Sequence, residues 1–206
     1  MNSDVAVDAY SPTMKVLHWA TAVLIITLLL LGWILTSELI SSTRMLNMLF
    51  GLHKSLGITV LLLTLFRIPW RIAHPAPPLP PSLRPWEIVV VGLVHKLLYV
   101  LLVLQPLTGW MVSTVSTHKS LFFGLFRLPD LPFVAYLGSA ATLLPLLEDI
   151  HGALASLLAL LLVLHVGAAF KHHWGVRDDV LLRMSPAFLA PFLLALRTGG
   201  KRRDGV

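Results

Sequence analysis

The chain has 206 residues, of which 56% are hydrophobic and 13% are charged, and its mean hydropathy is +0.81. A water-soluble domain of this length would have more charge on its surface, so the composition predicts an integral membrane protein. The absence of cysteine excludes disulfides, iron–sulfur clusters and c-type haem attachment. The net charge of +6 comes from basic residues that flank apolar segments, which indicates membrane topology and no nucleic-acid partner.

Four apolar segments are long enough to cross a hydrocarbon layer about 30 Å thick. They cover residues 15–36, 52–72, 86–112 and 146–171. The proline-rich stretch His74–Pro81 ends the second segment, Pro106 is expected to kink the third, and the fourth is expected to begin after Pro145. These features predict an all-α fold, a four-helix bundle in the membrane.

Two further segments are expected to lie at the membrane surface. The loop Ser113–Leu144 contains Phe122–Phe126, an apolar stretch too short to cross. Residues 187–206 begin with a short apolar segment and end in Lys201-Arg202-Arg203, which predicts an interfacial helix with a basic tail.

Lysine and arginine are unequally divided between the two sides of these spans. One side has Arg67, Arg71, Arg84, Lys171, Arg177, Arg183 and Arg197, and the other has Arg44, Lys119 and Arg127 offset by Glu38, Asp130, Glu148 and Asp149. Because cytoplasmic loops are enriched in basic residues, both termini are expected to be cytoplasmic.

Histidine is the main candidate for chemistry. His151 and His165 lie fourteen residues apart in the fourth span, which on a helix brings the second ring to within about 40° of the first and roughly 21 Å further along. The topology assigns His53 and His151 to the outer depth, and His18 and His165 to the inner depth. Facing imidazoles at two depths predict two b-type haems held between the helices. The alternative is that these are interfacial or hydrogen-bonding histidines in a haem-free small transporter.

His95 lies at the inner depth and could replace His18 or His165 as a ligand. Four residues after each favoured histidine stands a small residue, whereas Tyr99 follows His95 and would crowd a porphyrin. We therefore expect His95 to hydrogen-bond a haem propionate or a substrate. His74 and His118 lie in predicted loops and are expected to be solvated.

His172 follows His165 by seven residues, about 20° off the same helix face, and His173 is its neighbour. Either imidazole could supply a proton to a quinone. The alternative is an interfacial anchor of basic and aromatic residues formed with Lys171 and Trp174.

Short motifs along the chain resemble those of the bacterial cytochrome b561 family, four-helix di-haem cytochromes related to the b-type cytochrome subunits of nickel hydrogenases. They are Leu17-His18-Trp19, Leu52-His53-Lys54-Ser55-Leu56-Gly57, Val94-His95-Lys96-Leu97-Leu98-Tyr99, Pro106-Leu107-Thr108-Gly109, Glu148-Asp149-Ile150-His151-Gly152, Leu164-His165, Lys171-His172-His173 and Leu181-Leu182-Arg183-Met184-Ser185-Pro186. The resemblance covers residues 11–186, which we expect to form one domain. It implies two haems b in the bacterial inner membrane, with His18, His53, His151 and His165 as axial ligands of the haem irons.

The resemblance also implies electron transfer between a donor and a membrane quinone. The specific hypothesis is oxidation of superoxide at the outer side coupled to reduction of ubiquinone, with Lys54 and Lys119 attracting the anion and Arg67, Arg71 or Lys54 pairing with haem propionates. His95, His172 and His173 are the candidate catalytic residues. The alternative is a haem b membrane anchor whose donor is a partner dehydrogenase or hydrogenase on the outer side.

Overall fold

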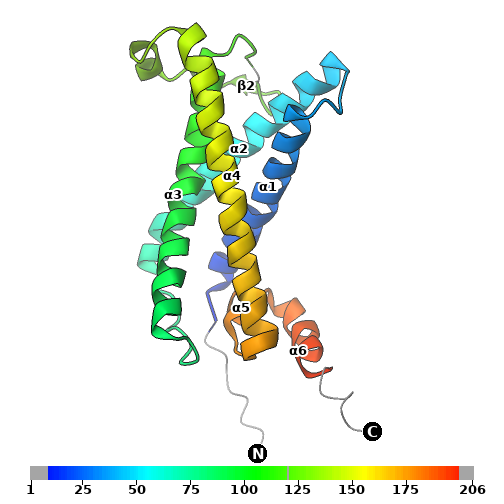
Figure 1. Ribbon diagram of the computed structural model, residues 1–206, viewed down its shortest axis with the longest axis vertical. Helices are drawn as coiled ribbons and strands as arrows, with labels where there is room; N and C mark the ends of the chain where they lie inside the picture. Colours follow the sequence, from blue (N-terminus) through cyan, green and yellow to red (C-terminus); the bar gives the residue numbers. More distant parts are fainter. Residues whose placement is uncertain (1–8, 120, 200–206) are drawn as a thin grey trace, which may run out of the picture.

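The computed structural model describes residues 9–119 and 121–199, and four long helices dominate it (Figure 1). They are α1 (Pro12–Thr36), α2 (Thr43–Ala73), α3 (Pro85–Val115) and α4 (Ala140–Phe170). Each of the four is long and apolar enough to cross a membrane. Helices adjacent in sequence pack together, and the α1–α2 pair is tilted against the α3–α4 pair.

Serine side chains set the starts of three of these helices. The hydroxyls of Ser11, Ser42 and Ser139 accept hydrogen bonds from backbone N–H groups in the first turns of α1, α2 and α4. Because Ser139 caps α4, this helix begins at Ala140, before the expected start near residue 146, and Pro145 lies inside it. A proline removes one backbone hydrogen bond without stopping a helix that is already capped upstream.

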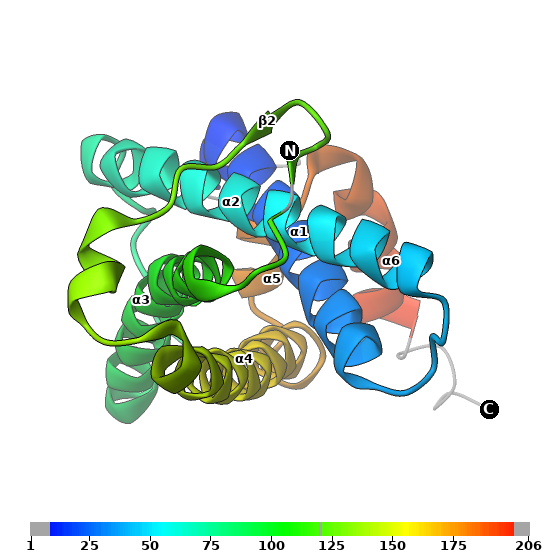
Figure 2. The same ribbon diagram turned by 90° about the horizontal axis from the view of Figure 1, so that it is seen from above.

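The described part of the connection between α3 and α4 has short regular elements and is seen from above in Figure 2. It contains a small antiparallel hairpin, β1 (Leu121–Phe122) and β2 (Phe126–Arg127), and the 3₁₀ turn η1 (Pro132–Tyr136). Phe123 and Gly124 form the tight turn with φ values of 46° and 77°. The Phe123 N–H donates to the buried hydroxyl of Ser55 at 2.9 Å, which fastens the hairpin to α2.

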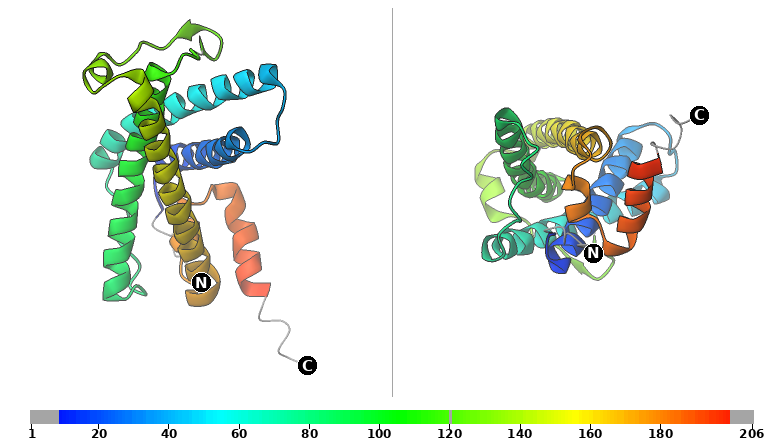
Figure 3. Two further views of the ribbon diagram at one scale, coloured as in Figure 1. Left: turned by 45° about the horizontal axis from the view of Figure 1, so that its top comes forward. Right: turned by 90° about the horizontal axis from the view of Figure 1, so that it is seen from below.

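At the opposite end, α4 continues into a π-helical turn, η2 (Lys171–Val176), which ends at Arg177 in the left-handed conformation. Three short elements follow: α5 (Val180–Met184), η3 (Ala187–Leu189) and α6 (Ala190–Gly199). They lie on the side of the bundle where α1 begins (Figure 3), and the Trp19 indole donates to the Met184 carbonyl at 3.0 Å. The predicted basic tail Lys201–Arg203 lies outside the described residues.

All four helices contribute to one buried apolar cluster in the middle of the bundle, here called the central layer. It consists of Ile25, Val60, Leu101, Leu102, Leu158 and Leu161. Ile25 and Val60 stand seven residues after His18 and His53, and Leu158 stands midway between His151 and His165. The central layer therefore lies between the two depths at which the histidines were expected.

Apolar side chains on the outside of the bundle are highly exposed. Val16 and Val163, for example, are 67% and 69% exposed. An exposed apolar surface of this extent around four long helices indicates a hydrocarbon environment.

Candidate functional site: two histidine pairs

The first histidine pair joins α2 to α4. The ring centroids of His53 and His151 lie 6.3 Å apart with an interplanar angle of 76°. Glycines on the other two helices border the pair: a Cβ atom at Gly32 of α1 would lie 3.6 Å from His53 Cε1, and one at Gly109 of α3 would lie 3.0 Å from His151 Cε1. All four helices thus contribute to this site.

The two imidazoles of this pair differ in their hydrogen bonds. His151 Nδ1 lies 3.0 Å from Thr108 Oγ1. The Gln105 side-chain amide lies 3.1 Å from the His151 carbonyl oxygen and 3.3 Å from His151 Nε2. His53 Nδ1 is buried and has no hydrogen-bond partner among the described residues.

The second histidine pair joins α1 to α4 on the other side of the central layer. The ring centroids of His18 and His165 lie 6.2 Å apart with an interplanar angle of 59°. His95 of α3 also faces His165, at a centroid distance of 5.3 Å. The His95 Nδ1–H donates to the Val91 carbonyl at 2.7 Å, and Arg67 Nη2 lies 3.1 Å from His18 Nδ1.

The separation of the rings is one condition that a pair must meet to hold an iron between its imidazoles. With metal–nitrogen bonds of about 2.0 Å, two imidazoles on opposite sides of one metal have ring centroids roughly 6.3 Å apart. The His53–His151 and His18–His165 pairs match this separation, whereas His95 and His165 are too close. The described residues contain no group of three or more His, Cys, Asp or Glu side chains that could hold a bare metal ion. Two-imidazole sites of this kind suit haem, because the porphyrin supplies the remaining ligands.

Unpaired donors lie on α2 at and near Arg67, the residue that contacts the second pair. Arg67 Nε, Trp70 Nε1 and Arg71 Nη1 are buried without a hydrogen-bond partner in the described part of the chain. The guanidinium groups of Arg67 and Arg71 lie over the rings of Tyr99 and Tyr10, at 5.2 and 5.5 Å from the ring centroids. Buried donors without acceptors are costly, so these groups suit the carboxylates of a haem.

His172 and His173 are buried at the inner end, where they connect separate segments. His172 Nδ1 lies 2.7 Å from Asp178 Oδ2, which also accepts from Ser82 at 2.7 Å. Burial alone raises the pKa of Asp178, but hydrogen bonds from Ser82, His172 and the Val180 N–H outweigh it and hold this pKa below its usual value. His173 Nε2 donates to the Leu193 carbonyl at 3.1 Å. Both imidazoles are buried, whereas Lys171 and Trp174 are exposed, although the ring centroids of His173 and Trp174 lie 5.6 Å apart.

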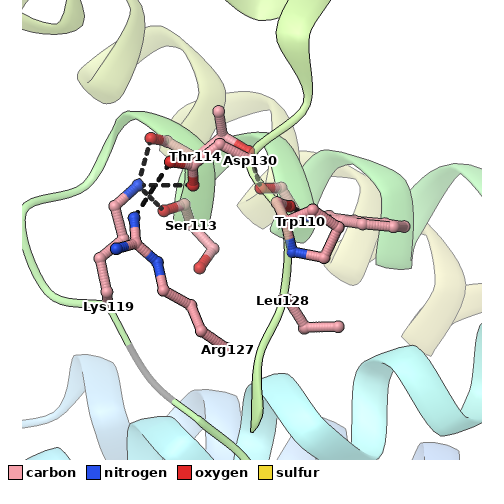
Figure 4. Close-up of a pocket in the computed structure, with 8 residues that line it drawn as sticks. Trp110, Ser113, Thr114, Lys119, Arg127, Leu128 and Asp130 are labelled. Atoms are coloured by element: carbon pink, nitrogen blue, oxygen red, sulfur yellow. Dashed lines mark hydrogen bonds and ion pairs between the residues drawn. The ribbon is translucent and has the colours of Figure 1, made fainter.

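The outer cations Lys119 and Lys54 differ in how far their charge is compensated, and Figure 4 shows the surroundings of Lys119. Lys119 Nζ lies 2.8 Å from Asp130 Oδ1 and also donates to the Ser113 and Thr114 carbonyls at the end of α3. Its hydrogen bond is the main cause of the lowered pKa of Asp130. Lys54 donates to the His118 carbonyl at 2.8 Å and has no carboxylate partner within the described residues. Lys54 is therefore the better candidate for attracting an anion.

The remaining two histidines lie away from both pairs. His118 is exposed in the α3–α4 connection, as expected. His74 is also exposed, but its ring stacks on Trp70 at a centroid distance of 4.3 Å.

Sequence reasoning missed four residues of the outer site: Gly32, Gln105, Thr108 and Gly109. An available signal was Gln105, because a strongly polar side chain in the middle of an apolar span needs a partner. Thr108 and Gly109 stood in a motif that supported the family resemblance, but no role was assigned to them. Gly32 gave no signal, because glycine is common in membrane helices.

The fold is that of a four-helix membrane protein with a histidine pair on each side of its central layer. The model for prokaryotic cytochrome b561 matches residues 9–187, and the chain belongs to this family. Family membership implies haem b and electron transfer in a membrane.

Three relatives are similar to most of the chain. Cytochrome b561 homolog 2 of Escherichia coli (strain K12) is 29% identical over 178 residues, covering 86% of this chain and 91% of the relative. Cytochrome b561 homolog 1 of the same organism is 30% identical over 183 residues, covering 87% and 98%. A probable superoxide oxidase CybB of Yersinia pestis is 29% identical over 135 residues, covering 66% and 73%.

Proposed function

We propose that this protein holds two haems b and passes electrons from a donor on the outer side to a quinone in the membrane. His53 and His151 would hold the outer haem, and His18 and His165 would hold the inner haem. The observation that supports this best is that both pairs have the ring separation of a two-imidazole iron site, on opposite sides of the central layer.

Held between two imidazoles, a haem would supply one-electron transfer and would not bind oxygen. The residues around each pair orient the imidazoles and exclude water from them. Arg67 and Arg71 supply donors for the carboxylates of the inner haem.

We propose superoxide as the donor and ubiquinone as the acceptor. The similarity to a relative named as a probable superoxide oxidase supports this choice. Two superoxide ions release two electrons and leave as two molecules of oxygen, while one quinone takes up two electrons and two protons. His172, His173 and His95 are the candidate proton donors at the inner side. Among them, His172 is held by the ionised carboxylate of Asp178.

The inner side is proposed to be the cytoplasm of a bacterial cell, with the protein in the inner membrane and both termini cytoplasmic. The arginines at the end of the bundle where α1 begins support this orientation. Reporter domains fused to the two ends of the chain test it. Activity of a reporter that folds only in the periplasm would contradict it.

The test of the proposed function begins with the haem content of the purified protein. We expect two b-type haems per chain and rapid reduction of the oxidised protein by superoxide in stopped flow, with re-oxidation by a quinone analogue. A haem-free protein would indicate the transporter alternative. Reduction by dithionite but not by superoxide would indicate a partner protein as donor. His118→Ala, a histidine outside both pairs, is the matched control and should behave as the wild type.

A further inference from the structure

One turn of α3, Gln105–Gly109, lies against His151 although it contains no histidine. Gln105, Thr108 and Gly109 all approach the imidazole or the backbone of His151. We propose that this turn positions the outer haem ligand by fixing the tautomer and the ring plane of His151. The inference rests on the proposed function, because it treats His151 as an iron ligand.

The contacts of Gln105 define which nitrogen of His151 has the proton. A backbone carbonyl oxygen can only accept, so the Gln105 atom 3.1 Å from the His151 carbonyl must be the NH₂ group. The same NH₂ group lies 3.3 Å from His151 Nε2, which must then be an acceptor. A neutral imidazole with an acceptor at Nε2 has its proton at Nδ1.

Thr108 leads to the same tautomer independently. Its hydroxyl has one proton, which it donates to the Gln105 carbonyl at 2.9 Å. Its oxygen is therefore an acceptor toward His151 Nδ1 at 3.0 Å, so the Nδ1–H donates to Thr108. This tautomer puts the lone pair of the imidazole on Nε2, as an iron ligand requires. In this structure that lone pair accepts from the Gln105 amide, so binding of an iron would replace the Gln105 contact.

Gly109 has no side chain, which allows α3 to lie close to the imidazole of His151. A Cβ atom there would lie 3.0 Å from His151 Cε1, so an alanine would push the ring away from its present plane. The hydroxyl of Thr108 is the partner that distinguishes His151 from the proposed ligands His53 and His18 within the described residues. His53 Nδ1 has no partner in the described part of the chain, and His18 Nδ1 faces the Arg67 guanidinium.

An acceptor at Nδ1–H makes the opposite nitrogen a stronger base, which favours ferric over ferrous iron. Thr108→Val keeps the branched shape and removes the acceptor. We expect the ratio of ferric to ferrous outer haem at a fixed applied potential to fall about tenfold. This equals a rise of about 59 mV in the midpoint potential of a one-electron couple. The inner haem should keep its potential.

The experiment is a potentiometric titration of the purified holoprotein, combined with electron paramagnetic resonance of the ferric haems. Thr108→Ser, which keeps the hydroxyl, should restore the wild-type potential and signal. Thr27→Val is the control, because the exposed Thr27 hydroxyl donates to the Val23 carbonyl of its own helix, away from His151. Gly109→Ala should change the resonance signal of the outer haem by turning the ring of His151.

The outcomes separate the two proposals. Two haems with unchanged potentials in Thr108→Val, or a Thr108→Ser variant that behaves like it, would overturn the positioning role alone. A wild-type protein without haem would overturn the proposed function and this inference together. Loss of the outer haem in Thr108→Val but not in Thr108→Ser or Thr27→Val would support the positioning role.

Discussion

The identity of the inner haem ligand is open to a decisive test, because three imidazoles converge there. His18 and His95 both face His165, at centroid distances of 6.2 and 5.3 Å. A two-imidazole iron site needs roughly 6.3 Å, so an iron between His95 and His165 would require these rings to separate by about 1 Å. His95 is also held by its short hydrogen bond to Val91, which resists that movement. The geometry therefore favours His18.

We expect His18→Ala to lose one of two haems and His95→Ala to keep both. In the difference spectrum between the dithionite-reduced and oxidised protein, the b-type absorbance per chain should fall by half in His18→Ala. It should be unchanged in His95→Ala and in the control His118→Ala. If His95→Ala loses half of the absorbance while His18→Ala retains all of it, the assignment from ring separation is wrong.

Three further predictions concern stability. Leu158→Ala, in the central layer, should lower the free energy of unfolding in mixed micelles by about 2 kcal/mol through lost packing, whereas the neighbouring exposed Leu157→Ala should change it little. The lowered pKa of Asp178 means that its ionised form stabilises the fold at neutral pH and that this contribution is lost below about pH 4. Asp178→Asn should therefore flatten the acid side of the curve of Tm against pH, and an equally steep curve would contradict this. Ser55→Ala removes the acceptor of the Phe123 N–H and should speed hydrogen exchange in the hairpin, whereas Ser156→Ala, on a solvent- or lipid-facing part of α4, should not.

The four helices were predictable because hydropathy determines which segments can cross a bilayer. The residues at which the helices begin were harder to predict. Proline is usual in the first turn of a helix, which predicted a start of α4 near Pro145. The helix instead begins at Ala140, because the Ser139 side chain caps it there. The hairpin at Phe123 was not predicted, because a bulky residue with positive φ needs an outside partner, here Ser55 from a distant helix.

The pairing of the histidines could be predicted from the membrane depth of each one, because fourteen residues on α4 span the distance between two levels in the membrane. The residues that surround each pair could not be predicted in this way. Small residues four positions after each histidine were expected to make room for porphyrin, yet the glycines that border His53 and His151 are Gly32 and Gly109 on neighbouring helices. Which residue of one helix faces a residue of another depends on the rotation and tilt of both helices, which a single sequence does not contain.

The central layer determines what kind of charge can cross the middle of the bundle. Its six side chains are all aliphatic and buried, so an ion crossing them would lose its hydration without compensation. An electron needs no such hydration, so an electron that passed between the two histidine pairs, as proposed, would travel without a companion ion. Such a transfer would be an electrical current, on which a membrane voltage acts with about 2.3 kcal/mol per charge and 100 mV for a full crossing.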